Sequence, residues 1–405
     1  MKSKFIPAYL LVFVNVLGFG ILMPVLPFIV EDMGASEWVY GLLLSLYSAF
    51  QFIGSPLLGA ISDERGRKPI LIISQIGTLI SWCVFLFALI IPEYMIFGLS
   101  IPLIIMVFSR MLDGVTGGNN SVANAYVSDI TTPEEKKYIF GYLGAISGIG
   151  FIIGPGLGGW ASGLTEGFEG TILAAITLSF LTLLSLLFLL KESHPKEKRT
   201  PKQKHSFKEA IQITKRIKHA KPSKFIKRLF LLKFIFSIMM AFYIATIALF
   251  IKDLFNYSAV ELGHFMLFAG SFLVFNQAVM SKLFIKKFGA FNTLIIGMSL
   301  TTIGLFCLTI SSDLITYLSF YYILNLGLAL SFNTFNTLIA LNADPHHQGE
   351  IMGISESISS FCNAIFPVIG AALYGMYSYN IYYFIAALPF TALLIALKSK
   401  QEHIE

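Results

Sequence analysis

Three ionisable side chains lie inside long apolar stretches of this sequence, where charge is costly. Arg110 and Asp113 are three residues apart, so on a helix they share one face. Glu356 lies in a second apolar stretch with no cation beside it in the sequence. A carboxylate that gains and loses a proton can couple proton movement to another process, which makes all three residues proton-coupling candidates. The sequence leaves open whether Asp113 or Glu356 carries the proton, and whether Arg110 and Asp113 form a purely structural ion pair.

The composition of the chain indicates that lipid surrounds the elements that position these residues. Of the 405 residues, 56% are hydrophobic and 13% are charged, and the mean hydropathy is +0.74. A soluble globule needs more polar cover than this. A membrane helix needs roughly 20 mainly apolar residues, and twelve windows satisfy that requirement. They are Phe5–Val30, Trp38–Ile61, Pro69–Ile91, Phe97–Tyr126, Tyr138–Gly163, Thr171–Leu190, Leu229–Ile251, Leu262–Ile285, Phe291–Ile310, Ile315–Leu341, Ile351–Tyr374 and Ile381–Leu397.

The basic residues indicate how these windows are oriented. All but three of the 29 Lys and Arg residues fall in the two terminal segments and in every second loop, the exceptions being Arg110, Lys233 and Lys252. By the positive-inside rule, both termini and the long central loop are cytoplasmic. The net charge of +6 is therefore interpreted as a topology signal, and nucleic acid is not expected as a partner.

A basic linker at 191–228 divides the chain into two parts, 1–190 and 229–405, each with six windows. The two parts resemble each other weakly, because a shift of 212 residues carries Pro155 to Pro367 and Gly158 to Gly370. Parallel repeats of this kind are typical of transporters. The sequence thus predicts an all-α polytopic membrane protein of twelve transmembrane helices in two pseudo-symmetric six-helix bundles.

The loop after the second window reads GAISDERGRKP. This pattern resembles the signature loop of the major facilitator superfamily. In that family the loop holds together the cytoplasmic ends of the two halves in the outward-facing state. The resemblance implies a conformational gate made of Gly59, Asp63, Gly66 and Arg67, with Asp129 as the partner of Arg67. The alternative is that Arg67 serves only to set the topology.

The fifth window carries a run of glycines that an ordinary helix would disfavour by about 1 kcal/mol each. The residues are Gly141, Gly150, Gly154, Pro155, Gly158 and Gly159. They resemble the antiporter motif G-x8-G-x3-G-P-x2-G-G at every fixed position, and that motif is associated with exporters. The alternative interpretation is a small-residue packing seam without a transport role.

The first window reads LGFGILMPVLP from Leu17 to Pro27 and resembles the first helix of the twelve-span drug/proton antiporters, most closely the tetracycline exporters. The resemblance extends through VANAYVSDITTPEE and thins out in the second half. Asn15 stands where the tetracycline exporters have an aspartate. An amide cannot carry a proton, so their coupling scheme does not transfer whole.

Polar residues on the inner faces of the windows predict a central substrate cavity with its charges in the first half. The predicted cavity residues are Asn15, Ser121, Asn124, Tyr243, Tyr322, Asn325 and Asn333.

Together these patterns predict a secondary active transporter that exports a drug-like small organic molecule by alternating access, coupled to protons. Uptake or facilitated diffusion of a nutrient by the same fold is the first alternative, and a non-transporting receptor is the second. No nucleotide loop, metal-ligand spacing or nucleophile constellation occurs, so we expect no enzyme activity, no cofactor and no metal. The expected partners are the substrate, protons and the lipid bilayer, with the chain a monomer in the inner (plasma) membrane.

Overall fold

The structure, a computed structural model, describes residues 5–96, 99–195, 197, 199, 222–311, 313–343 and 348–404. Most of the predicted linker at 191–228 therefore lies outside the described residues. The helices are α1 (Ile6–Leu22), α2 (Leu26–Asp32), α3 (Glu37–Arg65), α4 (Arg67–Ile90), α5 (Ile101–Gly117), α6 (Asn120–Asp129), α7 (Pro133–Ser162), α8 (Glu169–Leu189), α11 (Lys224–Phe255), α12 (Ala259–Phe275), α13 (Ser281–Phe288), α14 (Ala290–Leu308), α15 (Leu314–Asn342), α16 (Gln348–Tyr377) and α17 (Ile381–Ile404).

Two of the predicted windows contain a broken helix. The first is divided into α1 and α2, which meet at a bend of 42° where Pro24 and Pro27 disrupt the backbone hydrogen bonds. The fourth is divided into α5 and α6 around Gly118 and Asn119. In both places the polypeptide can present backbone and polar side chains that a continuous helix would hide.

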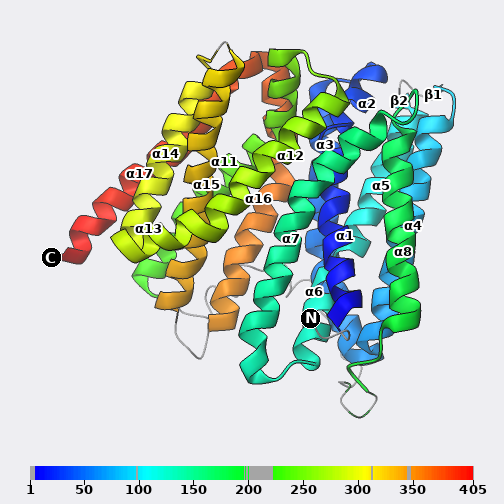
Figure 1. The fold of residues 1–405 in the computed structure, drawn as a ribbon, viewed down its shortest axis with the longest axis horizontal. Helices are drawn as coiled ribbons and strands as arrows, with labels where there is room; N and C mark the ends of the chain where they lie inside the picture. Colours follow the sequence, from blue (N-terminus) through cyan, green and yellow to red (C-terminus); the bar gives the residue numbers. More distant parts are fainter. Residues whose placement is uncertain are drawn as a thin grey trace. The chain divides into compact units, whose positions relative to one another are not determined.

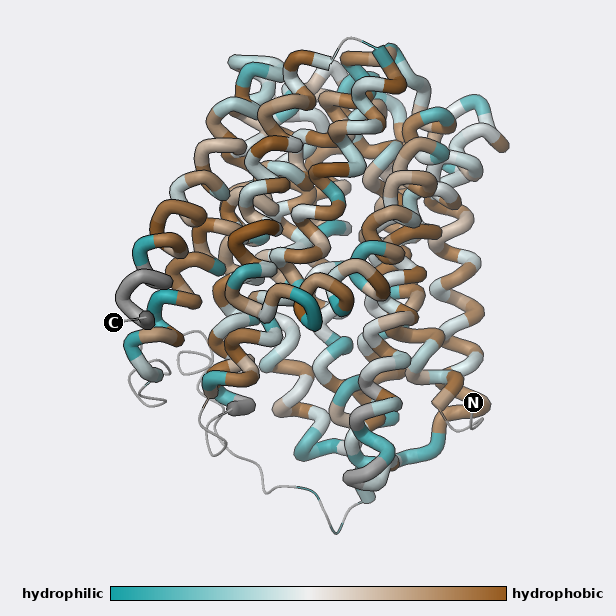
Figure 2. The backbone as a smooth tube through the Cα atoms, turned by 60° about the vertical axis from the view of Figure 1, so that its left-hand side comes forward, coloured by the Kyte–Doolittle hydropathy of each residue, from teal (hydrophilic) through white to brown (hydrophobic). Residues whose placement is uncertain are grey.

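Ten helical stretches of the described residues are long and apolar enough to cross a membrane, and the bent α1–α2 pair brings the number to eleven. One of the ten, Glu350–Lys398, contains both α16 and α17, which are separated by the short 3-10 turn Ser378–Asn380. Helix therefore occupies each of the twelve predicted windows. Figure 2 shows hydrophobic residues, in brown, along much of the helical tube.

Local signals in the sequence fix several helix ends. Thr132 begins α7 with a capping box, in which its side chain accepts from the Glu135 amide. Asp313 begins α15 and accepts from the Thr316 amide at 3.0 Å, and the hydrogen bonds from Thr316 lower the pKa of the Asp313 carboxyl. Outside the helices, the short strands β1 (Met95–Ile96) and β2 (Leu99–Ser100) pair in antiparallel register.

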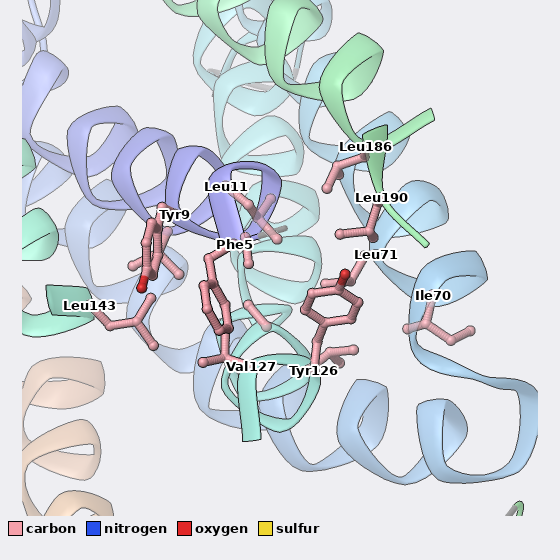
Figure 3. Close-up of a cluster of buried hydrophobic side chains, with 14 residues drawn as sticks. Phe5, Tyr9, Leu11, Ile70, Leu71, Tyr126, Val127, Leu143, Leu186 and Leu190 are labelled. Carbon is pink, nitrogen blue, oxygen red and sulfur yellow. The ribbon is translucent and has the colours of Figure 1, made fainter. Parts of the chain in front are cut away.

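The chain forms two compact units. Unit 1 comprises Met1–Ala35, Leu42–Ile211 and Ile251–Leu267, and unit 2 comprises Ser36–Gly41, Gln212–Phe250 and Phe268–Glu405. In unit 1, α1 lies beside α7, and α4 lies beside α5 and α8 (Figure 1). A buried apolar cluster joins α1, α4, α6, α7 and α8 (Figure 3). Its labelled members are Phe5, Tyr9, Leu11, Ile70, Leu71, Tyr126, Val127, Leu143, Leu186 and Leu190.

The core of unit 2 is rich in aromatic residues. Phe250 packs against Tyr382 with ring centroids 4.7 Å apart and meets Tyr317 edge to face at 5.9 Å. Helices α14 and α15 lie side by side in Figure 1 and approach very closely, since a Cβ added at Gly304 would stand 2.7 Å from the Leu324 backbone. Small residues that permit such approach are the usual means of packing helices in lipid.

Candidate functional site

The predicted Arg110–Asp113 pair lies inside unit 1, enclosed by protein. Arg110 is 2% exposed and Asp113 is 5% exposed, and the guanidinium donates to the carboxylate at 2.8 Å. The guanidinium lies over the rings of Tyr47 and Trp82, 4.7 and 5.7 Å from their centroids. Aromatic faces of this kind stabilise a desolvated cation. The pair is thus shielded from lipid by α3 and α4, while its role in proton coupling stays a prediction.

Glycines allow α5 to bring this pair against α3. A Cβ at Gly114 would stand 2.5 Å from the Tyr47 carbonyl oxygen, and one at Gly118 would stand 2.5 Å from the backbone of Gly54. Gln51 of α3 stabilises the contact between α3 and α5, because its side-chain amide nitrogen donates to the Gly117 carbonyl at 3.3 Å. The two backbones therefore touch, which sets the distance between Tyr47 and Arg110.

An amide cluster fills the break between α5 and α6. The Asn15 amide nitrogen donates to the Asn119 side-chain oxygen at 2.6 Å and to that of Asn120 at 2.9 Å. Asn119 in turn donates to the Ser74 hydroxyl at 3.0 Å. Asn15 is 7% exposed, so its amide serves this network, and its predicted place in a substrate cavity is not tested. The sequence analysis did not predict a role for Asn119 and Asn120. Two adjacent asparagines directly after Gly117 and Gly118 in an apolar window could have indicated a polar break in the helix.

The predicted gate residues of unit 1 lie together at the start of α4. Arg67 is buried, and its guanidinium forms ion pairs with Asp63 at 2.6 Å and with Asp129 at 3.1 Å. The family resemblance implied the pairing with Asp129. It also donates to the Ser62 hydroxyl at 2.6 Å. Glu192 was not predicted, and its carboxylate accepts from the Arg67 amide at 2.9 Å. A carboxylate at a helix N-terminus is favourable. The gating role of these contacts stays a prediction.

Gly66 and Gly59 have different structural roles in that loop. Gly66 has a φ of 99°, a conformation that favours glycine, and it lets α3 end and α4 begin within one residue. Gly59 lies near the Ser121 hydroxyl, which a Cβ at Gly59 would approach to 3.6 Å, an ordinary contact. Only Gly66 is therefore required by the backbone.

The glycines of the predicted antiporter motif form the contact between α7 and α1. An added Cβ would stand 3.0 Å from the Phe13 carbonyl oxygen at Gly150, 2.9 Å from the Leu17 carbonyl oxygen at Gly154, and closer still to the Ile21 carbonyl oxygen at Gly158. These three glycines are four residues apart, so one face of α7 lies against the α1 backbone.

The remaining motif positions lie on other faces of α7. Within unit 1, a Cβ at Gly159 would stand 2.7 Å from Gly263 Cα of α12, and the Pro155 ring lies against Gly20 of α1. At Gly141, an added Cβ would meet no atom of the described residues within 4 Å. The motif therefore combines tightly packed glycines with one, Gly141, that has open space toward the described residues, and its link to export stays a prediction.

Glu356 has a partner that the sequence did not assign. Lys233 of α11 is 3% exposed, and its ammonium donates to Glu356 at 3.2 Å, to the Ser355 hydroxyl at 2.7 Å and to the Asn336 side-chain oxygen at 3.3 Å. Lys233 lies well inside the predicted window Leu229–Ile251, and a lysine in an apolar window was the signal that could have pointed to it. Glu356 itself is exposed on unit 2, with its side chain at 60%.

Two of the other predicted cavity residues donate hydrogen bonds to residues of their own unit. Ser121 donates to the Ser55 carbonyl at 2.8 Å, and buried Tyr243 donates to the Tyr321 hydroxyl at 3.0 Å. Asn124 is exposed on α6. The cavity that the sequence predicts between the two halves stays a prediction.

Two of the last three cavity candidates, Tyr322 and Asn333, contact a π-helical segment, Asn276–Met280, between α12 and α13. The Asn333 amide nitrogen donates to the Gln277 carbonyl at 2.9 Å, and the Tyr322 hydroxyl donates to the Asn276 side chain at 3.4 Å. Asn325 is turned inward, where it donates to the Tyr321 carbonyl. Since a π-helix changes the pairing of backbone carbonyls, α15 stabilises this segment from outside.

No group of three or more His, Cys, Asp or Glu side chains could hold a metal ion within the described ranges. Cys83, Cys307 and Cys362 are free thiols.

Comparison with known proteins identifies the family. Residues 8–367 match the model of the Major Facilitator Superfamily, and the chain belongs to that superfamily of membrane transporters. The family predicted from the loop and helix motifs is thereby confirmed, and the fold class with it.

The chain is similar to drug-resistance proteins over most of its length. It is 29% identical to tetracycline resistance protein, class C, of Escherichia coli, covering 89% of this chain and 87% of that protein. It is 28% identical to multidrug resistance protein 2 of Bacillus subtilis, covering 94% and 90%. A crystal structure of a D-xylose-proton symporter matches 97% of this chain and 96% of its own length with a TM-score of 0.77 and 16% identity, which shows the shared fold.

Gly158→Ala tests whether the motif glycines are needed for packing. A methyl group pressed against the Ile21 carbonyl forces α7 away from α1, and overpacking of this kind costs about 1–3 kcal/mol. We expect a lower melting temperature in detergent. The matched control is Gly141→Ala, which meets no atom within 4 Å and should melt at or above the wild-type temperature because alanine favours helix. Equal melting of Gly158→Ala and wild type would contradict the packing role.

Proposed function

We propose that this protein is a secondary active exporter of drug-like small organic molecules, driven by proton antiport. Membership of a transporter superfamily supports the general class. The similarity to a tetracycline resistance protein and to a multidrug resistance protein supports export of drug-like molecules. The finer parts of the proposal are the direction of transport, the coupling ion and the residues that carry it.

The buried Arg110–Asp113 pair is the single observation that supports proton coupling most strongly. An ionised carboxylate within an apolar helix is costly unless it is paired, and Asp113 obtains a short hydrogen bond from Arg110. Protonation of Asp113 would remove the negative charge and release Arg110 to its two aromatic neighbours. The two protonation states thus differ in contacts, and a difference in contacts is what couples proton binding to a conformational equilibrium.

Alternating access would use the two halves, 1–190 and 229–405, as moving bodies joined by the linker at 191–228. Asp63, Arg67 and Asp129 would form part of the gate at the cytoplasmic end of unit 1, where Glu192 ties the beginning of the linker to α4. We further propose that the chain works as a monomer in the inner (plasma) membrane with both termini in the cytoplasm.

Asp113→Asn is expected to abolish export that depends on a proton gradient. In proteoliposomes with an imposed pH gradient, tetracycline transport by this variant should fall at least tenfold, because an amide cannot exchange a proton. Exchange of labelled for unlabelled tetracycline without a gradient should persist, and this readout separates loss of coupling from loss of folding. Gradient-driven transport at the wild-type rate would contradict the role of Asp113.

The matched control for that experiment is Glu93→Gln, which neutralises an exposed carboxylate outside the spans and should leave transport unchanged. The direction of substrate movement relative to that of the protons tests the alternative of uptake. If the substrate moves in the same direction as the protons, the protein is a symporter and the export proposal is wrong.

Orientation is tested by cysteine labelling in a background that lacks Cys83, Cys307 and Cys362. Glu166→Cys lies in the loop after α7, and Glu197→Cys lies in the basic linker. Because the positive-inside rule puts the linker in the cytoplasm, a membrane-impermeant maleimide should label Glu166→Cys in intact cells and Glu197→Cys only after permeabilisation. The opposite pattern would invert the proposed topology.

A further inference from the structure

We propose that Lys233 and Glu356 form an exchangeable ion pair, in which the positively charged group of a cationic organic substrate replaces Lys233 as the partner of Glu356. The proposal rests on the proposed transport of small organic molecules and specifies their charge. All four residues of the cluster, Lys233, Asn336, Ser355 and Glu356, belong to unit 2, so the site is complete within that unit.

Lys233 is buried and fully provided with acceptors. An ammonium group has three donors, and Lys233 places them on Ser355, Asn336 and Glu356. The side chain is 4% exposed, so no ligand can reach the ammonium while these contacts stand. Lys233 is therefore a fixed cation inside the unit and is not itself the ligand site.

Glu356, in contrast, has a second carboxylate oxygen that accepts no hydrogen bond from the described residues. Lys233 contacts only Oε1, and the side chain is 60% exposed. Glu356 lies five residues into the predicted window Ile351–Tyr374, about 7.5 Å along the helix axis. A carboxylate exposed at that depth is costly against hydrocarbon and stable against water. The surface of unit 2 around Glu356 is thus a water-facing surface with a negative group on it.

The contact distances favour exchange of the partner of Glu356. A charge-assisted hydrogen bond from nitrogen to a carboxylate is usually 2.7–2.9 Å long, and the contact between Lys233 and Glu356 is longer, at 3.2 Å. The shortest contact of the ammonium is with the neutral Ser355 hydroxyl, at 2.7 Å. If Glu356 turns away, Lys233 keeps hydrogen bonds to the neutral acceptors Ser355 and Asn336.

These contacts also define the chemistry of the ligand. The open position is a carboxylate oxygen, so the ligand must bring positive charge or hydrogen-bond donors. A monovalent organic cation matches the charge of the group that it replaces. A neutral molecule gains nothing from displacing Lys233, and an anion meets a carboxylate of its own sign. We expect the pair to select organic monocations over neutral compounds of similar size.

Equilibrium binding to the purified full-length protein tests the exchange, with ethidium as the cationic probe and chloramphenicol as the neutral one. Lys233→Met removes the internal competitor, and ethidium should bind about tenfold more tightly. Glu356→Gln removes the acceptor, and ethidium should bind at least tenfold more weakly. The double variant should resemble Glu356→Gln. Chloramphenicol affinity should change less than twofold in all three variants.

Ser355→Ala gives an independent test that keeps both charges. Without the Ser355 hydroxyl, Lys233 depends more on Glu356, so ethidium should bind several-fold more weakly than to wild type. This variant decides the question if Lys233→Met fails to fold. The matched control is Lys252→Met, which removes a lysine of the same helix that is paired with Glu31, and ethidium affinity should stay at the wild-type value.

Two results would overturn the exchange. Ethidium binding to Lys233→Met that equals or falls below wild type would show that Lys233 does not compete for Glu356. Unchanged ethidium binding to Glu356→Gln would show that Glu356 is not the acceptor. These binding measurements use no proton gradient, so the exchange proposal can fail while Asp113-dependent transport is still observed. If the binding results are as expected but transport does not depend on a proton gradient, only the proposal of proton antiport is refuted.

Discussion

Charge inside an apolar helix costs roughly 2.5–3.5 kcal/mol on insertion scales, and this cost governs how unit 1 is arranged around Arg110. The guanidinium is paired with Asp113 and enclosed between Tyr47 and Trp82, which come from the helices on either side. Breaking a buried pair by removing one partner typically costs about 3–5 kcal/mol. The surrounding helices must therefore hold their positions closely, and most other features of the unit serve that end.

Close backbone contact is the means by which the helices hold their positions. Gly114 and Gly118 bring α5 onto α3, while Gly150, Gly154 and Gly158 bring α7 onto α1. Lipid offers no hydrophobic force to press helices together, so short contacts between backbones have to supply the attraction. The same device recurs in unit 2, where Gly304 of α14 meets α15. The glycines that resemble a transport motif are thus first of all packing residues.

The sequence predicted the helical windows, the family and the placing of Arg110 and Asp113 on one helix face, because each depends on local composition or spacing. It did not predict the breaks at Pro24 and Gly118, since hydropathy alone does not reveal a lost turn of helix. It also missed the partners that come from distant parts of the chain. Lys233 is separated from Glu356 by 123 residues, and Glu192 from the Arg67 amide by 125. No spacing rule connects such residues, so only the packed helices show them together.

The π-helical segment at Asn276–Met280 has a consequence for how this chain can change length. A π-helical turn accommodates one residue more than an α-helical turn, and Asn333 satisfies the carbonyl of Gln277 within it. Deletion of one residue here would return the segment to regular α-helix and leave the faces of α13 pointing as before. The same deletion elsewhere in α12 would rotate everything after it by about 100°. A one-residue deletion is therefore tolerated best in this segment, because it keeps the orientation of the following helix α13.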